Sequence, residues 1–358
     1  MSASYLGENL IFIISQPRSG STLLQRVLGS HKELVISSEP WLMLHPVYGL
    51  REGGIQADFA ADWAAHGVRE FLEHYTDGVH VYDDGIRAFA QTIYGNAIAK
   101  GGGTRFIDKT PRYLLILDDL LRLFPAAKFI FLLRNPLSVL ASIINTQISH
   151  DLYTLERFRE ELLAGPGNML KAIDALGSRA IVVRYEDYVT QPEEHTREIC
   201  SRLQITYQPG MVDYSNSEPV KGFMQDRTGI QQHTKPSDAR IESWKQLLGE
   251  RTQLHYAQRY LDTLGSDTVD QLGYSYAELR DALELASKSI GGRVVLPWRV
   301  ALMHPGEPKG MDQLSISAYR NHRDYGPVAG WFRTVWSFWQ ALGVQLRWVF
   351  GRAGKSQD

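Results

Sequence analysis

Short apolar runs alternate with longer segments of helical periodicity along most of the chain. Runs typical of buried strands occur at 10–15, 34–36, 104–107, 128–133 and 180–184, and KFIFLL at 128–133 is the clearest of them. Helical spacing of apolar residues is found at 23–28, 113–124, 137–145 and 193–203, with a further helical stretch between 55 and 100. Because strands that alternate with helices are typical of a parallel sheet covered on both faces, the pattern predicts a three-layer α/β fold with a central parallel sheet flanked by helices.

The alternation stops near residue 285, beyond which Gly- and Pro-bearing sequence leads to an aromatic segment. This predicts one α/β domain over 1–285 and a helical C-terminal extension over 286–358. The extension contains an aromatic, Arg-bearing stretch with Trp331, Arg333, Trp336, Trp339, Arg347, Trp348 and Arg352. Two interpretations stay open. The helix packs on its own core or on a second copy in a homo-oligomer, or it lies as an amphipathic helix at a membrane surface.

Composition narrows the function classes. The 38 Lys and Arg residues nearly balance the 40 Asp and Glu residues, and the net charge of -2 offers no overall attraction to nucleic acid. The one cysteine, Cys200, excludes a disulfide framework and a Cys-rich zinc module. The 11 His residues show no clustered ligand spacing, so no metal is expected. Without a basic leader or an apolar run of about 20 residues, the sequence favours a cytoplasmic protein, peripheral to the membrane if the extension binds lipid.

A phosphate-binding arrangement follows the first predicted strand. Residues 16–22 read QPRSGST and lead directly into a helical pattern. Gly20 permits a tight turn, and the next amides stand at a helix N-terminus, where the helix dipole favours an anion. The candidate ligands of this loop are Arg18, Ser19, Gly20, Ser21 and Thr22. An ordinary strand-to-helix turn is the alternative for this loop taken alone.

A second basic and hydroxyl pair follows the strand predicted at 128–133. Arg134 comes directly after the strand, and Ser142 lies eight residues further on, about two helical turns. Because α/β folds bind ligands at the carboxyl ends of parallel strands, we expect Arg134 to share a crevice with the first loop. There it can hold a second phosphate by a charge-assisted contact, with Ser142 adding a hydrogen bond.

The first loop departs from the nucleotide-kinase motif GxxxxGK[ST]. Ser15 stands where the first Gly belongs, and Ser21 stands where the Lys belongs. The missing Lys disfavours a P-loop nucleotide kinase or phosphotransferase, which nevertheless stays as an alternative. A non-catalytic nucleotide-binding protein of the same fold is the other alternative.

Three motifs occur in a fixed order: SQPRSGSTLLQ from residue 15, LLRNPLSVLAS from residue 132 and VVRYEDYVTQPEE from residue 182. Together they resemble the sulfotransferase superfamily that uses 3'-phosphoadenosine 5'-phosphosulfate (PAPS), over roughly residues 10–248. The resemblance implies a P-loop-like α/β fold and an enzyme that moves a sulfuryl group to an acceptor hydroxyl. PAPS would be the co-substrate, 3'-phosphoadenosine 5'-phosphate (PAP) the product, and no metal would take part.

The resemblance also implies roles for individual residues. The first loop would hold the 5'-phosphosulfate, while Arg134 and Ser142 would hold the 3'-phosphate. Tyr185 matches a family position that lies against the nucleotide. Lys235 aligns with a Lys-bearing family loop near the 3' end of the donor, followed here by Trp244 and Lys245.

Glu39 is the base that the resemblance indicates. Many cytosolic members carry a His two residues after a Lys, but here Pro111 stands two residues after Lys109, and proline cannot accept a proton. The branch with tyrosylprotein, carbohydrate and bacterial enzymes uses a Glu shortly after the first helix, which Glu39 matches. Lys109 matches a Lys of that branch and, with Arg18, would stabilise charge on the bridging oxygen. The alternatives are a solvated turn for Glu39 and a structural ion pair with Asp108 or Asp118 for Lys109.

The motifs do not identify the acceptor. We expect a hydroxyl on a carbohydrate, a glycolipid or another alcohol. If the C-terminal helix touches a membrane, a lipid or lipid-linked glycan becomes the favoured acceptor.

Overall fold

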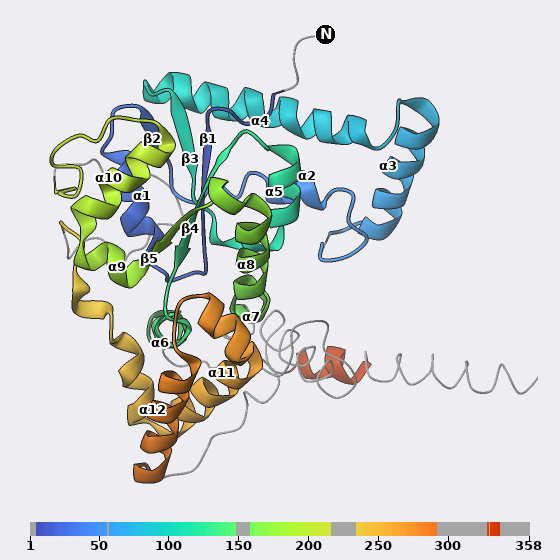
Figure 1. Cartoon of the computed structure of the whole chain (residues 1–358). Helices are drawn as coiled ribbons and strands as arrows, with labels where there is room; N and C mark the ends of the chain where they lie inside the picture. Colours follow the sequence, from blue (N-terminus) through green and yellow to red (C-terminus); the bar gives the residue numbers. More distant parts are fainter. Residues whose placement is uncertain are drawn as a thin grey trace, which may run out of the picture.

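The computed structural model describes residues 5–55, 57–147, 158–215, 234–291, 328 and 330–336. At its centre lies a sheet of five parallel strands in the order β2-β3-β1-β4-β5 (Figure 1). The strands are β1 (Leu10–Ser15), β2 (Leu34–Ile36), β3 (Arg105–Asp108), β4 (Lys128–Leu133) and β5 (Ile181–Arg184). The predicted central parallel sheet is therefore confirmed.

Successive strand residues enter two apolar layers, as the two-residue period of a strand requires. Phe12 and Phe129 belong to one layer, whereas Ile11 and Ile130 belong to the other. One face is covered by α1 (Ser21–Gly29), α9 (Tyr185–Thr190) and α10 (Pro192–Leu203). The other is covered by α4 (His80–Gly101), η1 (Pro111–Leu115), α5 (Leu117–Leu123) and α8 (Gly165–Leu176). The three-layer α/β prediction is confirmed.

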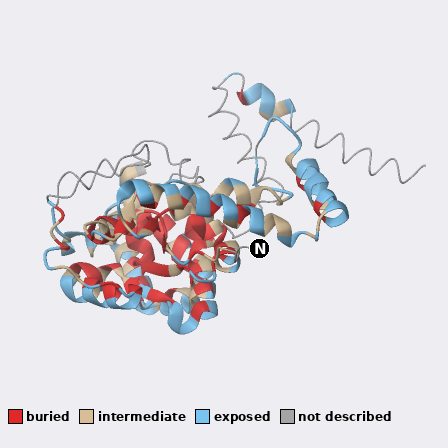
Figure 2. Ribbon diagram, turned by 90° about the horizontal axis from the view of Figure 1, so that it is seen from above, coloured by how far each residue is buried: buried red, intermediate tan, exposed pale blue. Residues whose placement is uncertain are grey.

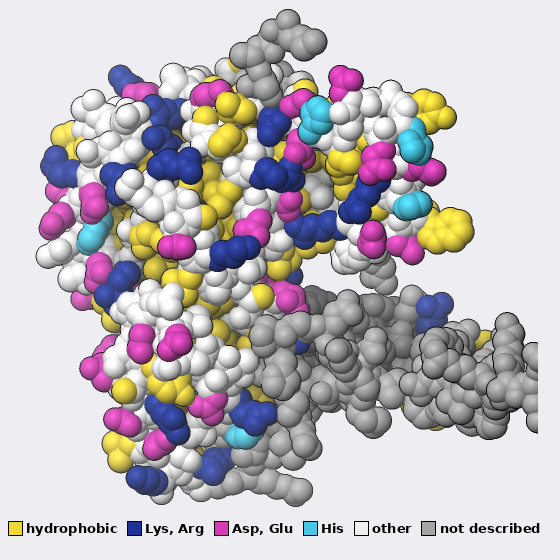
Figure 3. Space-filling model, turned by 45° about the vertical axis from the view of Figure 1, so that its right-hand side comes forward, with side chains coloured by type: hydrophobic (Ala, Val, Ile, Leu, Met, Phe, Trp, Pro, Cys, Tyr) yellow, Lys and Arg dark blue, Asp and Glu magenta, His cyan; other side chains and the backbone are white. Residues whose placement is uncertain are grey.

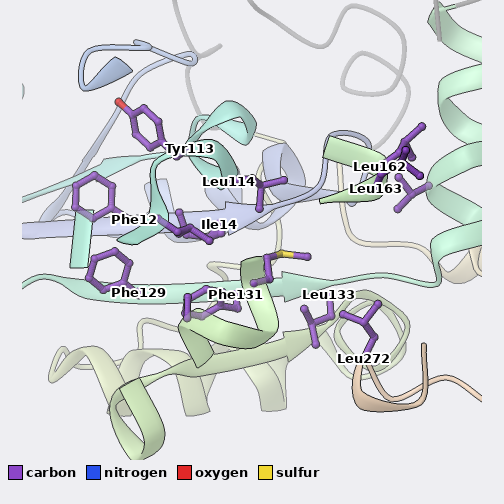
Figure 4. Close-up of a cluster of buried hydrophobic side chains, with 14 of the residues drawn as sticks. Phe12, Ile14, Tyr113, Leu114, Phe129, Phe131, Leu133, Leu162, Leu163 and Leu272 are labelled. Atoms are coloured by element: carbon purple, nitrogen blue, oxygen red, sulfur yellow. The ribbon is translucent and has the colours of Figure 1, made fainter. Parts of the chain in front are cut away.

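Aliphatic and aromatic side chains together fill the larger of the two layers (Figure 4). The rings of Phe12 and Phe129 stack with their centroids 5.3 Å apart, and Tyr113 meets Phe12 edge-on at 6.0 Å. Full burial of a side chain of this size contributes about 1.5–3 kcal/mol. This layer fixes β1 and β4 against η1, which holds the loops at their carboxyl ends in place.

The remaining helices extend the domain on the α6 side of the sheet (Figure 1). They are α6 (Pro136–Gln147), α7 (Arg159–Leu163), η4 (Asp238–Arg240), η5 (Ser243–Gly249), α11 (Arg251–Gln271) and α12 (Tyr276–Ser289). The 3-10 helix η3 (Gly177–Arg179) lies instead at the amino ends of the strands, just before β5, where Arg179 Nη1 donates to the Pro125 carbonyl at 3.1 Å. Leu254 and Tyr260 of α11 and Leu283 of α12 join the same apolar layer as the sheet. The domain boundary expected near residue 285 falls inside α12.

An arm formed by α3 (Ala61–Tyr75) and the outer part of α4 projects from the domain beyond α2 (Leu44–Tyr48) (Figure 1). Most of α3 is exposed (Figure 2), and Trp63 has 79% of its surface accessible. Hydrophobic and charged side chains are interspersed over this arm (Figure 3). Among the described helices, none combines the length and the apolar character that crossing a membrane requires.

One predicted helix is divided in the structure. The segment expected to be helical over 113–124 forms the 3-10 helix η1 and then α5, because Ile116 leaves the helical region at φ -130°. Tyr113, in η1, donates its hydroxyl to Asp108 Oδ2 at 2.8 Å. Of the aromatic extension, 330–336 is helical, while Trp339 and Trp348 lie outside the described residues.

Candidate active site

All five strands point their carboxyl ends at one edge of the sheet, and each is followed by a residue singled out in the sequence. In sheet order these residues are Glu39, Lys109, Arg18, Arg134 and Tyr185. The connection from β1 leads to β2 on one side, and that from β4 leads to β5 on the other. The sheet therefore has its topological switch point between β1 and β4, where α/β folds bind ligands.

The first loop has the backbone of an anion cradle. Gly20 has φ 91°, in the left-handed region, and a Cβ atom built on it would lie 2.6 Å from the Tyr185 ring. Only glycine fits both constraints. Gly20 is also the N-cap residue of α1, and with no side chain it leaves the first-turn amides to another acceptor. Such amides at a helix N-terminus bind phosphate and sulfate groups.

Arg134 ties this loop to β4 and to the later part of the chain. Its Nη1 donates to the Arg18 carbonyl at 2.6 Å, and its Nη2 donates to the Arg240 carbonyl at 3.0 Å. The guanidinium lies 4.2 Å from the centroid of the Tyr185 ring, a cation–π contact. Burial lowers the pKa of Arg134, an effect opposed by Tyr185 and Glu186.

The donor set fits a phosphorylated and sulfated ligand. Ser19 Oγ and Arg134 Nε are both buried, and neither has a hydrogen-bond partner among the described residues. Buried polar atoms are rarely left unsatisfied, so each of these two is suited to a ligand oxygen. Arg18 Nε donates to Ser142 Oγ at 3.3 Å, which brings Ser142 of α6 to the same cluster. Within the described ranges no group of three His, Cys, Asp or Glu side chains is placed to hold a metal.

Glu39 and Lys109 form an ion pair at the other end of the site. Lys109 Nζ lies 2.8 Å from Glu39 Oε1 and donates to Thr22 Oγ1 at 3.3 Å. Only 3% of the Lys109 side chain and 17% of the Glu39 side chain are exposed. Lys109 thus joins the carboxylate to the anion cradle, and this contact differs from the ion pair with Asp108 or Asp118 considered from sequence.

Asp108 fixes the end of β3 just before Lys109. Its carboxylate accepts hydrogen bonds from Tyr94 Oη at 2.5 Å, Tyr113 Oη at 2.8 Å and Thr110 Oγ1 at 2.9 Å. Burial raises the pKa of Asp108 to about 6, although these hydrogen bonds lower it. The network orients the backbone from which Lys109 extends.

The second and third sequence motifs support each other. Asn135 caps α6, since its Oδ1 accepts from the Leu137 amide at 2.9 Å. The Asn135 amide donates to Glu186 Oε1 at 3.1 Å, and Tyr274 Oη donates to Glu186 Oε2 at 2.5 Å. The RNP motif (134–136) and the RYED motif (184–187) therefore also have a structural role: they hold Arg134 and Tyr185 in contact.

Lys235 is the one predicted ligand that no described contact brings to this cluster. Its Nζ lies 3.2 Å from Asp213 Oδ2, and 64% of its side chain is exposed. The preceding residues 216–233 lie outside the described ranges. The part of this region that does reach the cradle is η4, where Arg240 contacts Arg134 through its carbonyl. Sequence reasoning missed Arg240, because no motif marks it and only the tertiary fold brings η4 to β4.

Comparison with known proteins gives a consistent result. The family model described as "Sulfotransferase family" matches residues 10–209, more than half of the chain. The nodulation protein NoeE of Sinorhizobium fredii is 30% identical over 298 residues, 76% of this chain and 68% of that protein. A putative protein-tyrosine sulfotransferase of Caenorhabditis briggsae is 26% identical over 73% of this chain and 90% of its own length.

A solved structure with the same fold is the sulfotransferase domain of the olefin synthase from Synechococcus PCC 7002. It is 24% identical to this chain, covers 77% of this chain and 98% of its own, and superimposes with a TM-score of 0.50. At this identity the likeness concerns the fold alone. The matched family region contains all five strands and the residues that follow them at the site.

Proposed function

The chain belongs to the sulfotransferase family, and from this premise we propose that it moves a sulfuryl group from PAPS to the hydroxyl of an acceptor. The observation that carries the choice of donor is the pair of buried, unpartnered donors at the switch point, Ser19 Oγ and Arg134 Nε, within the described residues. Together with the first-turn amides of α1 they offer two separate anion positions on one sheet edge. A nucleotide with phosphate groups at both its 3' and 5' positions needs two such positions.

The 5' side of the donor is assigned to the first loop. Arg18, Ser19, Gly20, Ser21 and Thr22 would surround the phosphosulfate. Arg134 and Ser142 would hold the 3'-phosphate, and Arg240 of η4 lies close enough to share that task, since its carbonyl already contacts Arg134. The Tyr185 ring, which is in cation–π contact with the Arg134 guanidinium, would lie against the nucleotide. Lys235 stays a sequence-based proposal for the same end.

Glu39 is assigned the role of general base. It takes the proton of the acceptor hydroxyl while that oxygen forms its bond to sulfur. The bond between sulfur and the bridging oxygen of the phosphosulfate breaks, and its electron pair leaves with that oxygen as PAP. Arg18 and Lys109 stabilise the charge that builds on this oxygen, and such fixed charges in a water-poor site are a major source of catalysis.

Lys109 is placed to couple the donor to the base. Its ammonium contacts Glu39 Oε1 and Thr22 Oγ1, so it stands between the carboxylate and the cradle. A donor bound in the cradle attracts this ammonium, which leaves Glu39 Oε1 open to the acceptor proton. The proposed order of binding is therefore donor first.

The extension over 286–358 is proposed to contact a surface outside the domain of a cytoplasmic protein. In the described segment 330–336, Trp331, Phe332 and Trp336 have 61%, 62% and 67% of their surface exposed. Co-sedimentation with anionic lipid vesicles, lost in Trp331→Ala/Trp336→Ala, would support a membrane. Concentration-dependent dimerisation lost in the same variant would support a homo-oligomer instead.

Calorimetric titration with PAP tests the donor assignment. The protein is titrated with PAP, with adenosine 5'-phosphate and with ATP plus Mg²⁺. We expect tight binding of PAP and weak binding of ATP. Arg134→Ala removes a charged hydrogen-bond donor, worth about 1.5–3 kcal/mol, so PAP should bind roughly ten- to a hundredfold more weakly. Because adenosine 5'-phosphate lacks the 3'-phosphate, its affinity should fall much less in Arg134→Ala.

Arg197→Ala is the matched control. Arg197 lies 4.0 Å from the ring of Tyr207 in a similar cation–π contact but is exposed on α10. Arg197→Ala should therefore leave PAP binding unchanged. Preference for ATP, or equal losses for PAP and adenosine 5'-phosphate in Arg134→Ala, would contradict the assignment. Arg134→Lys, which keeps the charge, shows whether any loss comes from misfolding of the loop.

A further inference from the structure

Trp41 has a backbone conformation that bulky residues rarely adopt. Its φ is 55°, in the left-handed region, two residues after Glu39. A non-glycine residue in this region is strained, and such strain is found mainly at functional sites. Asn, Asp or Gly would adopt this turn at lower cost, so the tryptophan side chain itself requires an explanation.

The strain at Trp41 is maintained by the network around Asp108. The Trp41 amide donates to Thr110 Oγ1 at 3.4 Å, and Thr110 Oγ1 in turn donates to Asp108 Oδ1. The Met43 amide donates to Tyr113 Oη at 3.0 Å, and Tyr113 Oη donates to Asp108 Oδ2. The segment around Trp41 is thus attached to the end of β3 at two points.

This attachment places the indole beside the proposed base. Trp41 Nε1 donates to Glu39 Oε2 at 3.3 Å, while Lys109 Nζ lies 2.8 Å from Glu39 Oε1. The carboxylate is therefore held on both oxygens. An acceptor hydroxyl that reaches Glu39 must approach next to the indole ring, which is partly exposed.

The segment that continues from Glu39 is poor in cations. Residues 39–50, EPWLMLHPVYGL, contain no Lys and no Arg. Arg51 comes next, and its Nη2 donates to Asp119 at 2.5 Å and to the Leu115 carbonyl at 3.3 Å. Two further cations contact this segment from elsewhere, Lys109 at Glu39 and Arg69 at the Leu50 carbonyl, and they are paired with Glu39 and Glu52. An anionic acceptor would therefore find little uncompensated positive charge along it. An uncharged acceptor with an apolar face would pack well against it.

We propose that Trp41 is the acceptor-binding aromatic residue of this enzyme and that the acceptor is a neutral carbohydrate. The indole face stacks on the C–H face of a sugar ring, which carries partial positive charge toward the negative aromatic face. A hydroxyl at the edge of the same ring then meets Glu39. This inference rests on the proposed function and specifies its acceptor class. Trp41 has a second role as a positioning residue, because its N–H orients Glu39.

Sulfate transfer from ³⁵S-labelled PAPS to two arrays tests the acceptor class. One array presents neutral glycans, and the other presents tyrosine-containing peptides. Label on the glycans is expected. Label on the peptides alone, or on neither array by protein that binds PAP, would overturn the inference. Failure to bind PAP would instead overturn the proposed donor, so the two failures are distinguishable.

Two variants separate the roles of Trp41 on a labelled glycan. Trp41→Ala should raise KM at least tenfold, because the stacking surface is lost. Trp41→Phe keeps a ring but no N–H, so KM should stay within about threefold while kcat falls. Trp63→Ala, which removes an exposed tryptophan of α3, is the matched control and should change neither. Unchanged KM in Trp41→Ala, with PAP affinity and thermal unfolding like the unmodified protein, would overturn the role of Trp41.

Discussion

Replacing Gly20 by alanine should damage the nucleotide site without removing any charged group. The backbone at Gly20 has φ 91°, and the added methyl group would lie 2.6 Å from two carbons of the Tyr185 ring. Tyr185 is largely buried, and its ring also carries the Arg134 guanidinium at 4.2 Å. The ring must therefore move, and Arg134 must move or lose its contact.

The cost can be worked from these two effects. An alanine in the left-handed region costs about 1–2 kcal/mol relative to glycine. Loss of a partly desolvated cation–π contact costs about 0.5–2 kcal/mol. Gly20→Ala should thus lower the free energy of unfolding by about 1.5–4 kcal/mol. PAP affinity should fall about tenfold or more, because the amide cradle and Arg134 are both displaced.

Urea unfolding and calorimetric titration with PAP measure the two effects. Gly67→Ala is the matched control, because Gly67 lies inside α3 and a Cβ there meets no atom within 4 Å. It should increase stability by about 0.5–1 kcal/mol. The double variant Gly20→Ala/Tyr185→Ala should lose less stability than the sum of the single variants, since the clash is gone. Strict additivity, or normal PAP binding by Gly20→Ala, would refute the reasoning.

Two further predictions concern the carboxylates of the site. Glu39→Gln should lower the transfer rate by about 10²–10⁴-fold, because that is the usual contribution of a general base. The affinity for PAP, measured by calorimetry, should stay within about twofold of normal. A transfer rate within threefold of normal would exclude Glu39 as the base. Burial raises the pKa of Asp108 from 3.8 to about 6, so its contribution to stability is complete below pH 3.8 and is lost as pH rises through 6. The free energy of unfolding should fall by about 3 kcal/mol over this range, at about 1.4 kcal/mol per pKa unit. In Asp108→Asn, urea unfolding between pH 4 and 7 should no longer show this fall. The same pH dependence in the variant would contradict the raised pKa of Asp108.

The strands could be predicted because parallel strands buried on both faces consist of nearly continuous apolar residues. LIFIIS and KFIFLL form β1 and β4 with the expected bounds, and the short LVI run forms β2. The helix expected at 113–124 is divided at Ile116, a break that its apolar periodicity does not show. Tertiary packing overrode local propensity there.

The site was predictable where its chemistry is local. A glycine, an arginine and hydroxyl residues between a strand and a helix indicate an anion cradle, and Gly20 indeed has the left-handed backbone that such a turn needs. Contacts between distant segments were not predictable in this way. Arg240 reaches Arg134 across 106 positions, and the backbone at Trp41 is determined by Thr110 and Asp108.

The sequence by itself therefore determined the elements, the anion cradle and the family resemblance, because each depends on residues close together in the chain. Only the tertiary structure decided the strand order. That order puts β3 between β2 and β1 and so places Lys109 between Glu39 and Thr22. Periodicity is a one-dimensional signal, whereas the order of strands and the burial of a charge depend on how all layers pack at once. The pairing of Glu39 with Lys109, 70 positions apart, is for that reason a property of the fold.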